Sequence, residues 1–157
     1  MRARFLDRRL VAAVLTAGGA LACESPLSPH DRDALRVAEA RWKSREQSSY
    51  TFEIRRACFC PPVLAEWARV QVSNGLVAGV VVLATGEEVP AAERAMFPTI
   101  DQVFETIHHT IDSDWIDRIE LTFDPVTGLP TFVSFVSKSN IADAGGAYYL
   151  RNLIAIP

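Results

Sequence analysis

Residues 50–62 read YTFEIRRACFCPP, a β-rich run that ends in two cysteines one residue apart and then in two prolines. Aromatic and β-branched residues favour strands, in which successive side chains point to opposite faces of the sheet. The two prolines at its end cannot donate backbone hydrogen bonds, so the strand is predicted to end at or just before Cys60. One face of the strand is predicted to carry Tyr50, Phe52, Ile54, Arg56, Cys58 and Cys60.

The N-terminus has the pattern of a secretory signal peptide. Residues 1–9 contain four arginines, and residues 10–21 are apolar with several small side chains. The apolar run is shorter than the roughly 20 residues that a permanent membrane-spanning helix needs. We therefore expect residues 1–22 to be removed during export.

The residues before Cys23 resemble the lipobox of bacterial lipoproteins, in which a cysteine sulfur is diacylated and the chain is cut just before that cysteine. Here Ala20 stands where leucine is commonest, and Leu21 stands where a small residue is usual. The resemblance implies fatty acyl chains such as palmitate on Cys23. They would anchor the protein to a bacterial membrane, on its periplasmic or extracellular face. Ordinary signal-peptidase cleavage without a lipid is the alternative.

The length and charge of the chain indicate one acidic domain. The chain has 157 residues and a formal net charge of −3, which becomes −6 once residues 1–22 take away four arginines and one aspartate. There is no basic excess to attract nucleic acid. We expect a signal peptide at 1–22, a lipid-anchored tether at 23–28 and a single domain at 29–157.

Two helices are predicted from their starting residues and apolar spacing. Ser28 can cap a helix over about 29–47 that begins with a proline, and Thr99 with Gln102 forms a capping box for a helix that ends near Asp112. The buried stripe of the first helix is predicted to be Leu35, Ala38 and Trp42. The stripe of the second is predicted to be Ile100, Val103, Phe104, Ile107 and Ile111.

Strand patterns fill most of the remaining chain. Asn74 and Gly75 separate two such runs and are typical of a two-residue hairpin turn. The run at 76–85 is apolar on both faces, which favours a central, doubly covered position or an interface. Besides the first, strands are predicted at 66–73, 76–85, 115–124, around 131–135 and at 147–156.

The strand at 115–124 alternates between apolar and polar residues, with Asp117 as the exception. We predict that Trp115 lies in the core together with Ile119, Leu121 and Phe123. The order of elements is helix, three strands, helix, three strands. Consecutive hairpins favour an α+β fold with an antiparallel sheet of about six strands and two helices packed on one face.

Several motifs resemble those of a bacterial family of small lipoproteins known only as a domain of unknown function. They are Tyr50-x-Phe52 leading into Cys58-x-Cys60, the helix start Thr99-Ile100-Asp101, and the turn Phe123-Asp124…Gly128-x-Pro130. The resemblance covers residues 42–137. It implies a secreted, lipid-anchored domain, and it supplies no catalytic residues.

Cys58 and Cys60 leave three alternatives open. A disulfide between them, or a pair of buried thiols, would be a local structural feature, which we favour because no Cys-x-x-Cys in a βαβ setting accompanies the pair. A strained bridge is easily reduced, so thiol exchange is the second alternative. The third is a metal site completed by His108 and His109, but adjacent helical residues point about 100° apart and do not easily face one ion.

Other catalytic patterns are missing from the sequence. It contains no Gly-x-Ser-x-Gly elbow, no phosphate loop and no zinc-protease motif. Arg55 is expected at the surface. For Trp67 the sequence does not decide between a place in the core and a place on a binding surface.

We expect a non-enzymatic binding or structural module without a cofactor. Its partners would be the membrane, through the lipid on Cys23, and an envelope protein. A thiol-based redox or metal-handling protein that uses Cys58 and Cys60 is the alternative.

Overall fold

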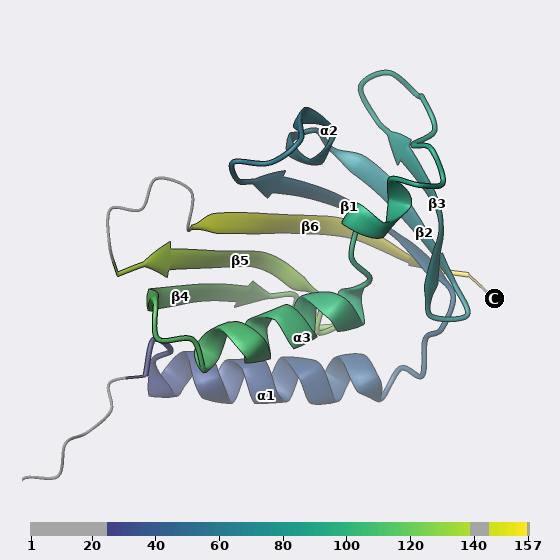
Figure 1. Ribbon diagram of the computed structural model, residues 1–157. Helices are drawn as coiled ribbons and strands as arrows, with labels where there is room; N and C mark the ends of the chain where they lie inside the picture. Colours follow the sequence, from purple (N-terminus) through teal and green to yellow (C-terminus); the bar gives the residue numbers. More distant parts are fainter. Residues whose placement is uncertain (1–24, 139–144, 157) are drawn as a thin grey trace, which may run out of the picture.

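The computed structural model describes residues 25–138 and 145–156 (Figure 1). Cys23 and the predicted signal peptide lie outside the described residues. No helix in the described ranges is both long and apolar enough to cross a membrane. The elements are α1 (Pro29–Lys43), β1 (Tyr50–Ala57), α2 (Pro62–Ala65), β2 (Ala68–Ser73), β3 (Leu76–Val82), the 3-10 turn η1 (Arg94–Met96), α3 (Ile100–Ile111), β4 (Ile116–Phe123), β5 (Pro130–Ser137) and β6 (Gly146–Ala155).

The strands form one twisted antiparallel sheet in the order β3-β2-β1-β6-β5-β4. The two long helices, α1 and α3, lie side by side on the same face of this sheet (Figure 1). Their apolar stripes and the inward side chains of the strands make one continuous core. The predicted α+β architecture is confirmed.

β1 lies in the middle of the sheet, between β2 and β6, and it carries the predicted buried face. Tyr50, Phe52 and Ile54 are buried under the helices. The hydroxyl of Tyr50 accepts a hydrogen bond from the backbone N–H of Ile100 at 3.2 Å, which satisfies one of the free donors at the start of α3. Burial raises the pKa of Tyr50 to about 12, so the phenol stays protonated even in alkaline solution that would ionise a free tyrosine.

The helices begin as predicted. Ser28 caps α1, and Thr99 with Gln102 forms the expected capping box on α3. α1 ends at Lys43, four residues earlier than predicted, and Glu46 then takes a positive φ of 49° that a helix cannot contain. Trp42 is buried and donates from Nε1 to Oδ1 of Asp101 at 2.9 Å, which ties the two helices together.

β3 is an edge strand, so the first of the two alternatives predicted for it, a central and doubly covered position, was wrong. The chain after it folds back along the free edge: the N–H of Val89 donates to the carbonyl of Val80 at 2.8 Å, and the N–H of Val82 donates to the carbonyl of Glu87 at 2.9 Å. The guanidinium of Arg94 donates to the carbonyl of Ala78 at 2.8 Å. This return segment covers polar groups that an edge strand leaves unpaired.

The prediction that Trp115 lies in the core was also wrong, because half of its side chain is exposed (49%). β4 begins one residue later, and its register against β5 shifts between Ile116 and Arg118. Asp117 is therefore the extra residue of a β-bulge. Because of this extra residue, the residues before it point to the opposite face of the sheet from the one that simple alternation predicts. Ile116 occupies the core position that simple alternation assigns to Trp115 or Asp117.

The chain before α1 packs against the edge of β4. The carbonyl of Pro26 accepts a hydrogen bond from the N–H of Ile119 at 3.0 Å. Leu27 is only 2% exposed and belongs to the core. The packed domain therefore begins no later than Pro26, within the segment expected as a tether.

The turn between β4 and β5 presses against α1. Oδ1 of Asp124 accepts hydrogen bonds from the N–H groups of Val126 and Thr127 at 3.0 and 2.7 Å, which fixes the turn. Gly128 follows with a φ of 78°, and a Cβ placed there would lie 2.3 Å from the carbonyl oxygen of Ala38. A side chain at this position would thus push the turn away from the helix.

The outer face of the sheet, which lies away from the helices, buries one carboxylate. Glu53 is 5% exposed. Its two oxygens accept hydrogen bonds from Arg69, Arg151 and Asn152 at 3.2, 2.9 and 2.8 Å. Burial alone would raise the pKa of Glu53, but the hydrogen bonds from Arg151, Arg69 and Asn152 outweigh it and hold that pKa below its ordinary value.

A β-bulge in β6 positions the side-chain amide of Asn152 beside Glu53. Thr51 pairs with Ile154 and Glu53 pairs with Arg151, so residues 152 and 153 together face the single residue between them on β1. Asn152 takes a positive φ of 53°, which asparagine tolerates better than most residues. The bulge thus turns the amide of Asn152 toward the Glu53 carboxylate.

Gly128→Ala is expected to destabilise the domain far more than Gly86→Ala. Both glycines have a positive φ, but a Cβ at Gly86 meets no atom within 4 Å. Backbone strain alone should lower the free energy of unfolding by about 1–2 kcal/mol in Gly86→Ala. The clash with α1 should raise the loss to about 3–5 kcal/mol in Gly128→Ala. Urea unfolding followed by circular dichroism measures both, and equal losses would contradict the close approach.

Glu53→Gln is expected to lower stability in a pH-dependent way. Because the folded pKa of Glu53 lies below its unfolded value, the carboxylate stabilises the fold above about pH 4.3, and this contribution disappears as the pH falls through the folded pKa. The arginines are half exposed, so we expect a loss of about 1–2 kcal/mol at pH 7 that shrinks toward pH 3.

Glu120→Gln is the matched control for Glu53→Gln, since Glu120 pairs with Arg118 on the same face with both side chains about half exposed. Its effect should stay within about 0.5 kcal/mol at every pH. A loss in Glu53→Gln that is as large at pH 3 as at pH 7, measured by urea unfolding, would show that the charge of Glu53 has no part in stability.

Candidate functional site

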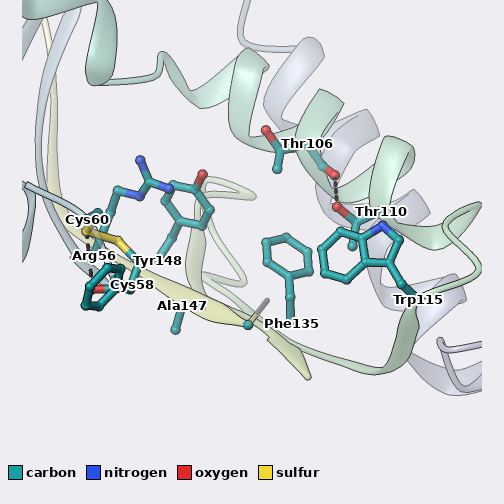
Figure 2. A pocket seen from close by; sticks show the side chains of 12 residues that line it. Arg56, Cys58, Cys60, Thr106, Thr110, Trp115, Phe135, Ala147 and Tyr148 are labelled. Carbon is teal, nitrogen blue, oxygen red and sulfur yellow. Dashed lines mark hydrogen bonds between the residues drawn. A yellow bond between two sulfur atoms is a disulfide. The ribbon is translucent and has the colours of Figure 1, made fainter. Parts of the chain in front are cut away.

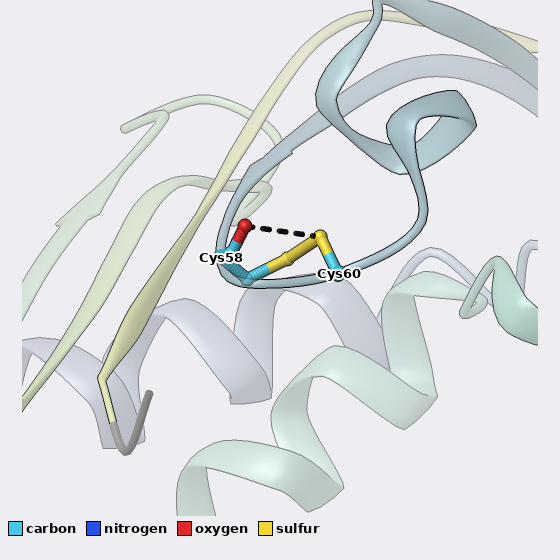
Figure 3. Close-up of a disulfide and its surroundings, with 2 residues drawn as sticks. All are labelled: Cys58 and Cys60. Carbon is cyan, nitrogen blue, oxygen red and sulfur yellow. Dashed lines mark hydrogen bonds between the residues drawn. A yellow bond between two sulfur atoms is a disulfide. The ribbon is translucent and has the colours of Figure 1, made fainter. Parts of the chain in front are cut away.

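Cys58 and Cys60 form a disulfide directly after β1 (Figure 3). Their Cα atoms lie 5.3 Å apart. Sγ of Cys60 also lies 3.4 Å from the carbonyl oxygen of Cys58, which is a contact and not a hydrogen bond because a disulfide sulfur carries no proton. The bridged form, one of the alternatives that the sequence left open, is therefore the state that the structure describes.

The disulfide closes a tight turn with Phe59 at its tip. The Phe59 side chain is 86% exposed, the highest value among the large exposed hydrophobic residues described. After the bridge, the single helical turn α2 buries Leu64. The turn is therefore held at both ends, by β1 and by α2, while its phenylalanine faces solvent.

An open cavity of about 360 Å³ lies between this turn and α3 (Figure 2). The disulfide lies on one side of it, Trp115 and α3 lie on the other, and Phe135 stands between them. Four aromatic residues line it, together with the bridged cysteines, three small residues and three polar side chains. The aromatic residues are Phe59, Trp115, Phe135 and Tyr148, and the polar ones are Arg56, Thr106 and Thr110. A volume of this size accommodates a small ligand or one to two side chains of a partner.

The register between β1 and β6 brings the positively charged side chain of Arg56 to the cavity. Arg56 on β1 pairs with Tyr148 on β6, and its guanidinium carbon lies 4.8 Å from the centre of the tyrosine ring. Tyr148 in turn meets Phe135 edge to face, with ring centres 6.3 Å apart. Within the described ranges Arg56 has no ion pair and no side-chain hydrogen bond, so its guanidinium is free to bind an anionic group.

The two threonines of the cavity already use their hydroxyl protons. Oγ1 of Thr106 donates to the carbonyl of Gln102 at 2.8 Å, and Oγ1 of Thr110 donates to the carbonyl of Thr106 at 2.6 Å (Figure 2). Their oxygens can still accept hydrogen bonds from a ligand. The arrangement therefore offers aromatic walls, one cation and two acceptors.

The structure does not bring the two histidines together with the cysteines in a metal-binding group. His108 meets Glu39 of α1 at 2.9 Å, and Glu39 also binds Lys43 at 2.7 Å. Burial would raise the pKa of Glu39, but hydrogen bonds from Lys43 and His108 outweigh it and lower that pKa. Within residues 25–138 and 145–156 there is no group of three or more His, Cys, Asp or Glu side chains that could hold a metal ion.

A second cluster lies on the opposite, outer face of the sheet. Arg55 is half buried there, with its guanidinium carbon 5.4 Å from the centre of the Trp67 ring and 4.8 Å from that of Tyr149. Its Nε is buried and has no hydrogen-bond partner. The sequence predicted an ordinary surface arginine and left Trp67 open, because nothing local shows that Tyr149 lies opposite Arg55.

Among curated proteins and among solved structures, nothing matches this chain. The profile of a family of unknown function, DUF6174, matches residues 34–155. The matched range runs from α1 to the end of β6 and includes the disulfide, the cavity and the outer cluster. The chain therefore belongs to the DUF6174 family of unknown function.

Proposed function

We propose that this protein is an exported, lipid-anchored domain of a bacterial cell envelope, and that it binds a partner protein through the cavity beside the Cys58–Cys60 bridge. Two observations support export. The N-terminus has the pattern of a signal peptide, and structural disulfides persist mainly outside the cytosol.

An anchor on Cys23 would hold the domain close to the membrane. The chain is fixed from Pro26 onward by its hydrogen bond to β4, so three residue steps separate Cys23 from the packed domain. Even fully extended, they span only about 10 Å. The cavity would then be presented to partners at the membrane surface.

The observation that carries the binding proposal is the exposure of aromatic side chains around a free cation. Phe59 and Trp115 flank the cavity and face solvent, although exposed aromatic surface is unfavourable in water. Aromatic and arginine side chains dominate the binding energy of protein interfaces. The partner we propose inserts an apolar side chain between these rings and places a carboxylate on Arg56.

A second candidate function is thiol exchange at the same turn. It is favoured by the position of the bridge at the rim of a cavity, where a substrate thiolate would attack one sulfur, form a mixed disulfide and release the other sulfur as a thiolate. In that case the single thiolate left in Cys60→Ser, that of Cys58, should attack a disulfide of an oxidised substrate and release the substrate's other sulfur as a thiolate. The mixed disulfide should then accumulate, because no second cysteine resolves it, and a non-reducing gel detects it. We expect no mixed disulfide.

The anchor is tested by the intact mass of the protein purified from membranes. We expect a chain that begins at Cys23 and carries acyl groups, together with a mass two hydrogens lower than that of the reduced form because of the bridge. Cys23→Ser should move the protein from the membrane fraction to the soluble fraction. An unmodified Cys23 in the native protein would end the anchoring proposal.

The binding site is tested by photo-crosslinking in cells. A benzophenone amino acid in place of Phe59 should give one discrete crosslinked product. Trp115→Ala in the same chain should reduce its yield about tenfold or more, because loss of a tryptophan hot spot costs about 2 kcal/mol or more. The same probe in place of Val126, which is 75% exposed on the β4–β5 turn, is the control. Equal yields with and without Trp115 would contradict the proposal.

A further inference from the structure

The outer face of the sheet carries an arginine that lies against two aromatic rings and has no hydrogen-bond partner among the described residues. The guanidinium carbon of Arg55 lies near the rings of Trp67 and Tyr149, at the distances given above, and that of Arg151 lies 3.8 Å from the centre of the same Trp67 ring. No described residue accepts a hydrogen bond from the Arg55 side chain or forms an ion pair with it, and its Nε is buried as well. The buried Nε is closed to an external ligand, but the terminal Nη groups have no partner among the described residues and can donate to an acceptor.

The charges around Arg55 favour an anionic ligand. Arg69 and Arg151 also lie on this face, and both bind the single carboxylate of Glu53. Three guanidinium groups and one carboxylate leave a local excess of two positive charges, although the whole chain carries a net charge of −3. An anion is therefore attracted to this face and repelled from much of the remaining surface.

We propose that the outer face is a second binding site, in which Arg55 takes a carboxylate from an acidic segment of a polypeptide. The guanidinium fork matches a carboxylate with two parallel hydrogen bonds. Tyr149 is extended by Phe132, with ring centres 5.2 Å apart, so half-buried aromatic surface surrounds the cation. Arginine beside tryptophan and tyrosine is the composition of a protein interface.

This site is separate from the cavity beside the bridge. Arg55 and Arg56 are neighbours in a strand, so their side chains point to opposite faces of the sheet. Arg55 pairs with Tyr149, and Arg56 pairs with Tyr148. Loss of binding at one face therefore leaves the other face available, and the two proposals fail independently.

The test uses hexaglutamate as the probe and nuclear magnetic resonance of the arginine Nε–H groups in the intact domain. We expect the Arg55 signal to move on titration, and we expect Arg55→Lys to weaken binding about tenfold, because lysine keeps the charge but loses the fork. Arg118→Lys is the matched control, since Arg118 lies on the same face and is already bonded to Glu120 at 2.9 Å. It should change the affinity less than about twofold.

Three results would overturn the proposal. The first would be an Arg55 signal of the wild-type protein that does not move at saturating hexaglutamate. This measurement does not depend on the folding of any variant. The second would be equal weakening of hexaglutamate binding by Arg55→Lys and Arg118→Lys, which would indicate general charge attraction. The third would be an Arg55 signal that inorganic phosphate, titrated at the same ionic strength, moves as strongly as hexaglutamate does. This would assign the site to a different class of ligand.

Discussion

The pairing of β1 with β6 holds the two halves of the sheet together. It joins residues about a hundred positions apart, such as Ile54 and Leu150, and it is the single link in the sheet between the strands before α3 and those after it. Closing so long a loop loses chain entropy before any contact compensates for it. The compensation comes from burying Tyr50, Phe52 and their neighbours beneath the helices, at about 1.5–3 kcal/mol for each large apolar side chain.

The same pairing builds both candidate sites at once. Two adjacent arginines face two adjacent tyrosines across the strand pair, and alternation sends one arginine–tyrosine pair to each face of the sheet. One pair lines the cavity under the disulfide turn, and the other holds the free guanidinium among the outer aromatic rings. Because both pairs belong to the central strands, the two surfaces keep a fixed spatial relation. A partner that engages both would have to reach around the edge of the sheet.

Sequence reasoning succeeded where structure is set by local chemistry and failed where it is set by distant residues. The caps at Ser28 and Thr99 and the helix stripes depend on residues three or four positions apart, and the structure confirms them. The edge position of β3 depends on a return segment that no local pattern reveals. The bulge at Asp117 adds one residue and reverses every assignment before it, which misplaced Trp115. The partners of Arg55 and Arg56 come from the register of β6, which the sequence near the arginines does not contain.

The hydrophobic core is large enough that the Cys58–Cys60 disulfide is not needed to stabilise the domain. More than twenty buried apolar residues form the core, so the domain has a hydrophobic interior that does not depend on a covalent staple. A bridge across so short a loop restricts the unfolded chain by only about 1–2 kcal/mol. Its larger effect is local, because it fixes the tip that holds Phe59 out of the core and against the solvent beside the cavity. A turn selected for stability alone would bury that ring or replace it with a polar residue. The combination of a covalent constraint with an exposed aromatic side chain is therefore better explained by recognition at the cavity than by folding.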